Sequence, residues 1–125
     1  MTDSIFSKII KGELPAYKIY EDEKTLAFLD IFPKSPGHTL VIPKIQIDKV
    51  YDLPDEYYAA VWDTTKKLSA HMDKVLGKRI FIKVIGTDIP HTHIHLIPDD
   101  PNHNPNPAKA DDDDLAKMAK RLKLN

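Results

Sequence analysis

Hydrophobic positions along the chain follow two different periods, and the helical period comes first. Apolar residues recur at helical spacing up to Lys11, after a cap that Asp3 or Ser4 can supply. A longer helical pattern begins at Pro54 and runs to about Leu76. We therefore predict a short N-terminal helix and one long helix. The long helix should bury one face made of Tyr58, Val61, Trp62, Leu68, Met72 and Val75.

Strand-like stretches lie between these helices and after them. Alternating, β-branched and aromatic residues predict five strands, at 16–21, 25–32, 38–43, 79–85 and 91–98. The charged turn Glu21–Lys24 joins the first two strands and predicts an antiparallel hairpin. Five strands and two helices make an α+β domain.

A tail follows the last predicted strand. Residues 99–108 are rich in proline and asparagine, which predicts an irregular loop. The acidic run Asp111–Asp114 then precedes a basic helical pattern, a charge order that suits the helix macrodipole, so we predict a C-terminal helix. We read residues 1–125 as one domain, with its core at about 4–98 and the loop and C-terminal helix at 99–125.

The composition fits a globular domain and removes several classes of function. Hydrophobic residues make up 42% of the 125 residues, and 18 basic against 19 acidic side chains leave a formal net charge of -1. This balance lacks the electrostatic footprint of nucleic-acid binding. The absence of cysteine excludes disulfides and thiolate metal sites, and no apolar stretch is long enough to cross a bilayer. Because the chain starts without a signal-peptide pattern, we expect a cytoplasmic protein.

Three of the six histidines fall in one short stretch at every second position: His91, His93 and His95. Because side chains alternate between faces along a strand, all three would project the same way, with neighbours ~6 to 7 Å apart. Ile94 and Leu96 would point to the other face and enter the core. The histidine face would then be free to line a site.

This spacing alone leaves two chemistries open. Zinc accepts three histidines and keeps a fourth position for a reacting group, although imidazoles in a flat row converge poorly on one ion. A neutral imidazole can instead attack phosphorus while flanking donors hold the phosphate oxygens. The geometry favours the second chemistry, with His93 as the nucleophile and His91 and His95 on either side.

The segment His91–Leu96 resembles the His-x-His-x-His signature of the histidine triad (HIT) family. Three further segments resemble the family in the right order: its opening segment at 5–15, its ribose-binding strand at 26–31 and its fourth-histidine strand at 36–44. Together the four segments span residues 5 to 98. The resemblance is to bacterial-type nucleotide hydrolases near the phosphoramidase branch. It implies a five-stranded antiparallel sheet with helices packed against it.

The resemblance also implies a catalytic cycle in which His93 forms a covalent nucleotidyl-histidine that water or another acceptor resolves. His91 and His95 would hold phosphate oxygens or assist the leaving group, and His38 would join the same hydrogen-bonded cluster. Asp30 would accept the ribose hydroxyls. By the same similarity, the base pocket would consist of Phe6, Leu14, Phe28 and Ile31.

One departure from the family pattern concerns metal. Many members that bind structural zinc carry Cys-x-x-Cys near the N-terminus and a histidine after the proline-lysine pair. This chain has Ser4, Ser7 and Gln46 at those positions. We therefore expect no metal and no cofactor.

A second departure lies just before the triad, where residues 84–90 resemble a shortened form found in some bacterial members. Thr87 and the backbone N–H groups around Gly86 can contact phosphate, whereas Asp88 adds negative charge near it. We include Thr87 and Asp88 in the nucleotide site, and the preference for a leaving group stays open.

These features predict an enzyme that hydrolyses purine nucleotide conjugates, such as nucleoside phosphoramidates, at the α-phosphate. Dinucleoside polyphosphate hydrolysis and transfer of the nucleotide to another acceptor are alternatives, because they share the attack at phosphorus. A nucleotide-binding module without turnover is the alternative of another class. We expect neither nucleic acid nor a membrane as a partner. The resemblance implies a homodimer through the long helix and an adjoining strand, and the apolar helix residues available for it are Tyr57, Tyr58, Val61 and Trp62.

Overall fold

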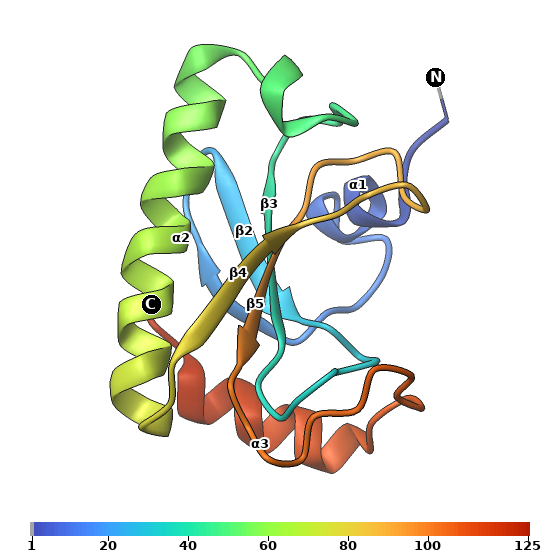
Figure 1. The fold of residues 1–125 in the computed structure, drawn as a ribbon. Helices are drawn as coiled ribbons and strands as arrows, with labels where there is room; N and C mark the ends of the chain where they lie inside the picture. The colour runs from blue at the N-terminus through green and yellow to red at the C-terminus, as the bar shows by residue number, and fades with distance from the viewer. Residues whose placement is uncertain (1) are drawn as a thin grey trace.

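The computed structural model describes residues 2–125 and confirms the predicted five-stranded antiparallel sheet with helices against it (Figure 1). The strands are β1 (Lys18–Glu21), β2 (Thr25–Leu29), β3 (Thr39–Pro43), β4 (Ile80–Val84) and β5 (Ile94–Pro98). The α-helices are α1 (Ile5–Ile10), α2 (Asp55–Leu76) and α3 (Asp112–Leu122), and a short 3-10 helix, Val50–Asp52, precedes α2. In the sheet the strands run in the order β1-β2-β3-β5-β4, and every neighbouring pair is antiparallel.

The helix ends follow from local sequence. The Ser4 side chain accepts the Ser7 N–H and caps α1. Gly77 ends α2 in the left-handed region, with φ 66°, which costs glycine little. Asp111 accepts the backbone N–H groups of Asp113 and Asp114 and caps α3.

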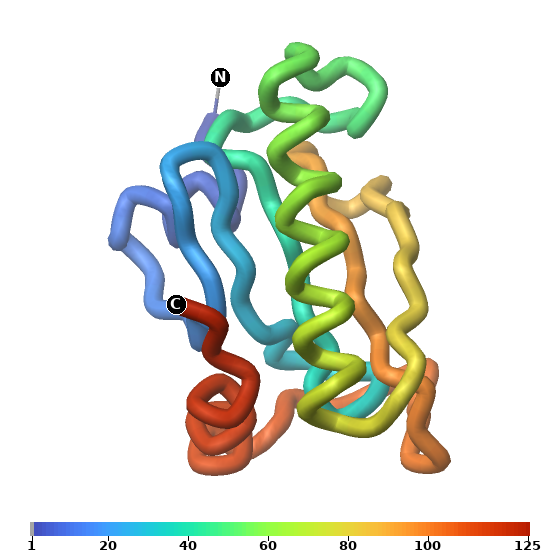
Figure 2. The backbone as a smooth tube through the Cα atoms, turned by 90° about the vertical axis from the view of Figure 1, so that its left-hand side faces the viewer, coloured from blue at the N-terminus to red at the C-terminus, as the bar shows by residue number. Residues whose placement is uncertain are grey.

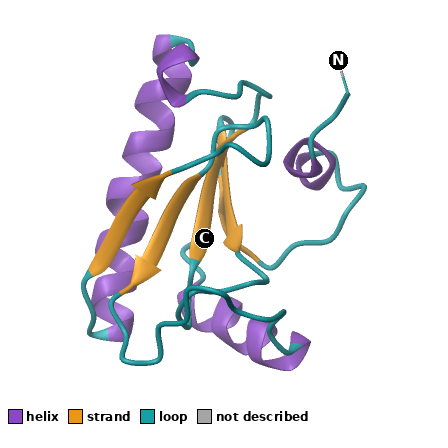
Figure 3. Ribbon diagram, turned by 45° about the vertical axis from the view of Figure 1, so that its right-hand side comes forward, coloured by secondary structure: helices purple, strands orange, loops and turns teal. Residues whose placement is uncertain are grey.

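The two faces of the sheet are covered by different helices. Figure 2 shows α2 lying across one face, and Figure 3 shows α1 on the opposite side. The α2 face carries the larger apolar cluster, to which α3 also contributes. A smaller cluster under α1 consists of Phe6, Ile9, Leu26, Phe28, Leu40 and Ile42. Neither α2 nor any other helix within residues 2–125 combines the length and apolar character that a membrane span requires.

The buried face of α2 differs in part from the predicted one. Val61, Leu68 and Met72 are fully buried, as predicted, whereas Tyr58 is 46% exposed, so its place on that face was wrong. Thr64 and Thr65 are buried on the same helix instead. A buried hydroxyl needs a partner, and the Thr64 Oγ1 lies 2.8 Å from the Thr25 Oγ1 of β2.

The predicted strands were too long, most of all the last one. β5 begins at Ile94, whereas the prediction began it at His91. Pro90 has no N–H to give to a ladder, and Thr92 donates its N–H to the Ile47 carbonyl, outside the sheet. The first part of the histidine stretch therefore bonds to the segment that follows β3.

The two edges of the sheet differ. Along β1, Leu124 donates its N–H to the Ile19 carbonyl, and the Asn125 side chain bonds both backbone groups of Glu21. The end of the chain thus covers the β1 edge. At the other edge β4 pairs with β5 on one side and with no strand within residues 2–125 on its outer side, and apolar side chains along it are half-exposed: Phe81, Ile82 and Val84.

Candidate active site

Three histidines and one carboxylate lie in a row across the α1 side of the sheet. His95 is on β5, His93 comes just before that strand, and His38 precedes β3. The ring centroids of His93 and His95 are 5.1 Å apart, and those of His95 and His38 are 5.2 Å apart. Asp30, directly after β2, ends the row with a carboxylate oxygen 3.7 Å from the His38 Nε2. The fold therefore brings together four of the predicted site residues from three separate segments.

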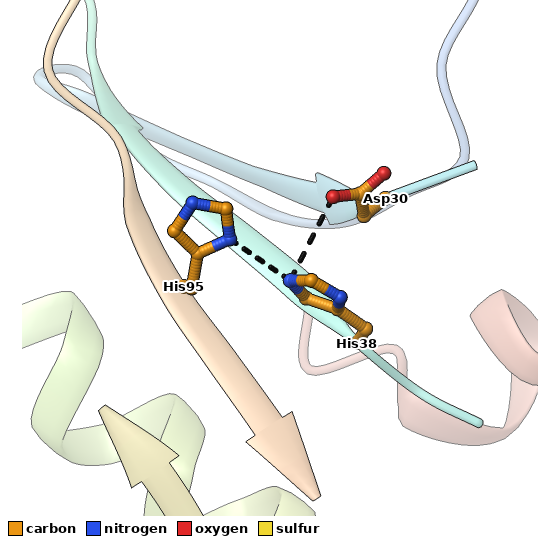
Figure 4. Close-up of side chains that lie close together, drawn as sticks. All are labelled: Asp30, His38 and His95. Carbon is orange, nitrogen blue, oxygen red and sulfur yellow. Dashed lines mark hydrogen bonds and ion pairs between the residues drawn. The ribbon is translucent and has the colours of Figure 1, made fainter. Parts of the chain in front are cut away.

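The hydrogen bonds of His38 fix the proton positions in this row (Figure 4). Its Nδ1 accepts the Lys34 N–H at 3.0 Å, so in the neutral ring the proton is on Nε2. That proton is donated to the His95 Nδ1 at 2.9 Å. His95 then carries its own proton on Nε2. The pair therefore presents a neutral N–H donor at the tip of His95.

His93 has the opposite arrangement. Its Nδ1 lies 2.8 Å from the His91 carbonyl oxygen, which can only accept, so the Nδ1 carries the proton. In the neutral ring the Nε2 then holds a lone pair, and within residues 2–125 it makes no hydrogen bond. A nucleophile and an N–H donor stand side by side in the row.

Burial keeps the rings of His38 and His95 neutral. Removal from water lowers the pKa of His38 to about 3 and that of His95 to about 4, and neighbouring cationic or imidazole groups act in the same direction. Burial likewise raises the pKa of Asp30, against a hydrogen bond from the Phe32 N–H. At neutral pH His95 is therefore a neutral donor.

The same cluster is the one place within residues 2–125 where three potential metal ligands converge. Atoms of Asp30, His38 and His95 all lie within 4.8 Å of one another. A metal on the His38 Nε2 would require a proton on its Nδ1, but that nitrogen faces the Lys34 N–H, which is itself a donor. The donor set suits a hydrogen-bonded relay better than a metal.

His91 lies on the same α1 side of the sheet, where Phe6 packs against both its ring and the His93 ring, but it is not part of the row. Its ring is fully buried, with Nε2 donating to the Pro43 carbonyl at 2.9 Å and Nδ1 lying 2.8 Å from the Ser4 Oγ. The physical reason lies in its neighbours, because Ser4 at the start of α1 and the Pro43 carbonyl at the end of β3 take up both ring nitrogens. With both nitrogens bonded, His91 is not placed to hold phosphate oxygens.

Three polar residues surround His91: Ser4, Ser7 and Gln46. From the sequence we interpreted them only as positions at which zinc ligands are absent. The Ser7 Oγ donates to the Gln46 Oε1 at 2.7 Å, and the Ser4 N–H donates to the same oxygen at 2.7 Å. Hydrogen bonds thus hold these side chains and His91 together. The signal in the sequence was the joint replacement of all three residues by polar side chains of similar reach.

The predicted base-pocket residues fall into two groups. Phe6 and Phe28 are buried with ring centroids 5.6 Å apart, and Phe6 also meets the edge of His93 at 5.1 Å. Leu14 and Ile31 are 38% and 37% exposed, on the segments after α1 and after β2. Phe6 connects the smaller apolar cluster directly with the proposed nucleophile.

The connection between β4 and β5 passes beside His93. A side chain on Gly86 would place its Cβ only 3.3 Å from the His93 Cε1, so the close approach favours glycine. Thr87 and Asp88 are exposed in this connection. Asp88 is close enough to the row to raise the pKa of both Asp30 and His95, in each case as a minor contribution.

A cavity of about 490 Å³ lies next to the row, between the segment 33–38 and α3. Asp30 and His38 line it, but His93 and His95 do not. The proposed nucleophile, His93, and the donor, His95, therefore do not line this cavity.

Comparison with known proteins places the residues of the row within a known domain family. A family model described as HIT domain matches residues 11–102, which include the row from Asp30 to His95. The chain belongs to the HIT family. Over 106 residues it is 42% identical to an uncharacterized HIT-like protein of Borreliella burgdorferi, covering 78% of this chain and 76% of that protein.

Other members of the HIT family extend this comparison. The chain is 40% identical over 96 residues to adenosine 5'-monophosphoramidase HNT1 of Saccharomyces cerevisiae, covering 75% of this chain and 61% of that protein. The crystal structure of a HIT-like protein from Bartonella henselae matches with a TM-score of 0.89 and 30% identity, covering 97% of this chain and 94% of that chain. HIT relatives of this chain thus include a protein named as a nucleotide hydrolase.

Proposed function

We propose that this HIT protein hydrolyses purine nucleotide conjugates at the α-phosphate through a covalent nucleotidyl-His93. The observation that supports it most is the proton arrangement of His93, whose Nδ1–H is held by the His91 carbonyl while Nε2 keeps its lone pair. A neutral imidazole in this state is a nucleophile that needs no prior deprotonation. The name of the yeast relative, adenosine 5'-monophosphoramidase, supports a nucleoside phosphoramidate as the substrate.

In the first step the His93 Nε2 forms a bond to the α-phosphorus, and the bond from phosphorus to the leaving group breaks. The positive charge that develops on the ring is stabilised by the His91 carbonyl at Nδ1. The Nε2–H of His95 is placed to donate to a phosphate oxygen, and His38 holds that tautomer. Water then attacks phosphorus, and the bond between phosphorus and the His93 Nε2 breaks. Its electron pair returns to the ring, the water gives up a proton to solvent, and the nucleoside monophosphate leaves.

We assign nucleotide binding to the residues around the row. Asp30 would accept the ribose hydroxyls, and Phe6 and Phe28 would form the buried wall of the base pocket, with Leu14 and Ile31 at its exposed margin. Thr87 and Asp88 would border the phosphate and the leaving group. Their exposure in the β4–β5 connection suits contact with a substrate that enters from solvent.

Intact-mass spectrometry after rapid quench with an adenosine phosphoramidate tests this proposal. The wild type should show one added nucleotidyl group and release AMP. His93→Ala should form no adduct and lose more than about 1,000-fold in turnover, because the nucleophile is gone. His103→Ala, which removes an exposed histidine in the loop after β5, is the matched control and should retain activity.

Other outcomes separate the alternatives. Faster turnover of dinucleoside polyphosphates than of phosphoramidates would favour dinucleoside polyphosphate hydrolysis. Recovery of the nucleotidyl group on an added acceptor would favour nucleotidyl transfer. Nucleotide binding by both proteins without an adduct or AMP from any substrate would overturn the enzymatic proposal in favour of a binding module.

We also propose a homodimer formed through β4 and α2. β4 offers an unpaired edge with half-exposed Phe81 and Ile82, and Tyr58 is exposed on the neighbouring helix. Val61 is fully buried within the chain and has no part in this surface. Light scattering should give twice the mass of one chain, and Ile82→Lys should give a monomer with an unchanged far-ultraviolet spectrum. A monomeric wild type would contradict the dimer.

A further inference from the structure

A buried polar cluster joins the start of α1 to the segment after β3 and to the histidine stretch. It consists of Ser4, Ser7, Gln46 and His91, which we call the His91 clasp. Ser4, Ser7 and His91 are all at least nine-tenths buried. The two serines lie at the start of α1, whereas Gln46 and His91 come from distant parts of the chain.

The hydrogen bonds of the clasp have a single consistent direction. The His91 Nε2 must donate, because its partner is the Pro43 carbonyl, so its Nδ1 accepts the Ser4 Oγ–H at 2.8 Å. The Ser4 Oγ in turn accepts the Ser7 N–H at 3.0 Å. The Ser7 Oγ–H goes to Gln46, and the Gln46 Nε2 donates to the Thr2 carbonyl at 2.9 Å. Each hydroxyl proton of the clasp therefore has one acceptor.

The clasp is connected to the nucleophile through the backbone of residue 91. The His91 carbonyl is the acceptor that holds the His93 Nδ1–H at 2.8 Å. Bonds on both ring nitrogens fix the side chain of His91, and Thr92 is fixed next to it by two bonds to the Ile47 carbonyl, from its N–H and its Oγ1. A change in the His91 ring would therefore move the carbonyl that sets the His93 tautomer.

We infer that Ser4, Ser7 and Gln46 are positioning residues for His93, acting through His91. This inference rests on the proposed function, because it assigns to the clasp the orientation of the attacking Nε2. The clasp holds the His91 carbonyl in line with the His93 Nδ1, and this keeps the lone pair on the nitrogen that faces the substrate. Phe6, on the same helix as the serines, packs against both the His91 and His93 rings at 5.8 and 5.1 Å. The N-terminal helix thus contributes to the base pocket and to the orientation of the nucleophile.

The test compares Ser4→Ala with two controls. Ser4→Ala removes the donor to the His91 Nδ1 and should lower kcat about 10- to 100-fold while KM changes by less than about twofold, since substrate contacts stay intact. Ser4→Thr keeps the hydroxyl and should retain most of the turnover. Thr64→Val removes a buried hydroxyl bond on the α2 face, away from the row, and should cost stability without changing kcat.

A second readout is independent of turnover. In the wild type, ¹⁵N spectra of the imidazoles should show His93 as the Nδ1–H tautomer, and Ser4→Ala should show a mixture of tautomers. Gln46→Met, at a position that is only partly buried, repeats the test where Ser4→Ala fails to fold. Equal kcat and an unchanged His93 tautomer in the folded variants would overturn the inference. If the wild type has no turnover, the proposed function fails, while the spectra still decide whether the clasp sets the tautomer.

Discussion

His91 and His95 are four positions apart and have the same side chain, yet their surroundings are opposite in character. Both nitrogens of His91 are bonded within the chain, to the Ser4 hydroxyl and the Pro43 carbonyl, and its ring is fully buried. His95 uses one nitrogen for His38 and leaves the other free within residues 2–125. His91 is anchored by both nitrogens, whereas His95 is anchored by one and can donate with the other.

The comparison shows that the partners of the two ring nitrogens decide what an imidazole can do. A carbonyl on one nitrogen and a hydroxyl on the other leave no group for a substrate. A chain that begins at a backbone N–H, passes through His38 and ends at the Nε2–H of His95 delivers a donor in a known protonation state. Burial, which makes all these rings neutral, is common to both cases and does not distinguish them.

The largest expected difference between the two histidines is in turnover. His95→Gln should lower kcat/KM about 100- to 1,000-fold, because one preorganised donor to the transition state is lost. His91→Gln should lower it about 10- to 100-fold, because it acts only through the orientation of His93. Steady-state kinetics with an adenosine phosphoramidate measures both effects.

The effect on stability should have the reverse order. His91→Gln leaves the Ser4 hydroxyl and the Pro43 carbonyl without good partners and should cost about 1–3 kcal/mol in the free energy of unfolding. His95→Gln should cost less, since His95 is less buried. Urea unfolding compares the two. A His91→Gln variant that matched His95→Gln in both turnover and stability would contradict the difference in role between the two histidines.

A further effect on stability is expected from pH. The pKa values of His38 and His95 in the folded chain, about 3 and about 4, lie below the unfolded value of 6.5. The unfolded chain therefore takes up protons first as pH falls. The free energy of unfolding should decrease from about pH 6.5 toward pH 4, by up to about 1.4 kcal/mol per pH unit for each group.

Removing one of these groups should reduce that slope. His38→Asn should show a shallower loss of unfolding free energy between pH 6 and pH 4.5 than the wild type, by about one proton. Urea titrations at several pH values give the slopes directly. Equal slopes for the two proteins would contradict neutral burial of His38.

Much of the fold could be predicted from the sequence because the strongest local signals agree with it. The helical spacing behind Ser4, the break at Gly77 and the acidic run before α3 each mark an element end that the structure confirms. Hydroxyl burial was harder to anticipate. Thr64 and Thr65 look polar in a hydrophobicity pattern, but the Thr64 hydroxyl meets that of Thr25 across the core.

The site could be predicted only in part, for a geometric reason. Alternation along a strand correctly separates His95 from Leu96, which is buried in the α2-side cluster. It also places His91 on the α1 side, but it does not indicate that both ring nitrogens of His91 are bonded within the chain. The partners of His91 lie 48 and 87 positions away, so no local pattern could indicate them.

The covered β1 edge sets a limit on assembly. Leu124 and Asn125 occupy the backbone groups of β1, which leaves β4 as the strand edge open to another chain. When two chains pair through β4, each has used its open edge, and a third chain finds no free strand to extend the sheet. In such a dimer, Leu124 and Asn125 would limit the growth of the sheet, and deleting them would expose the β1 edge to a further chain.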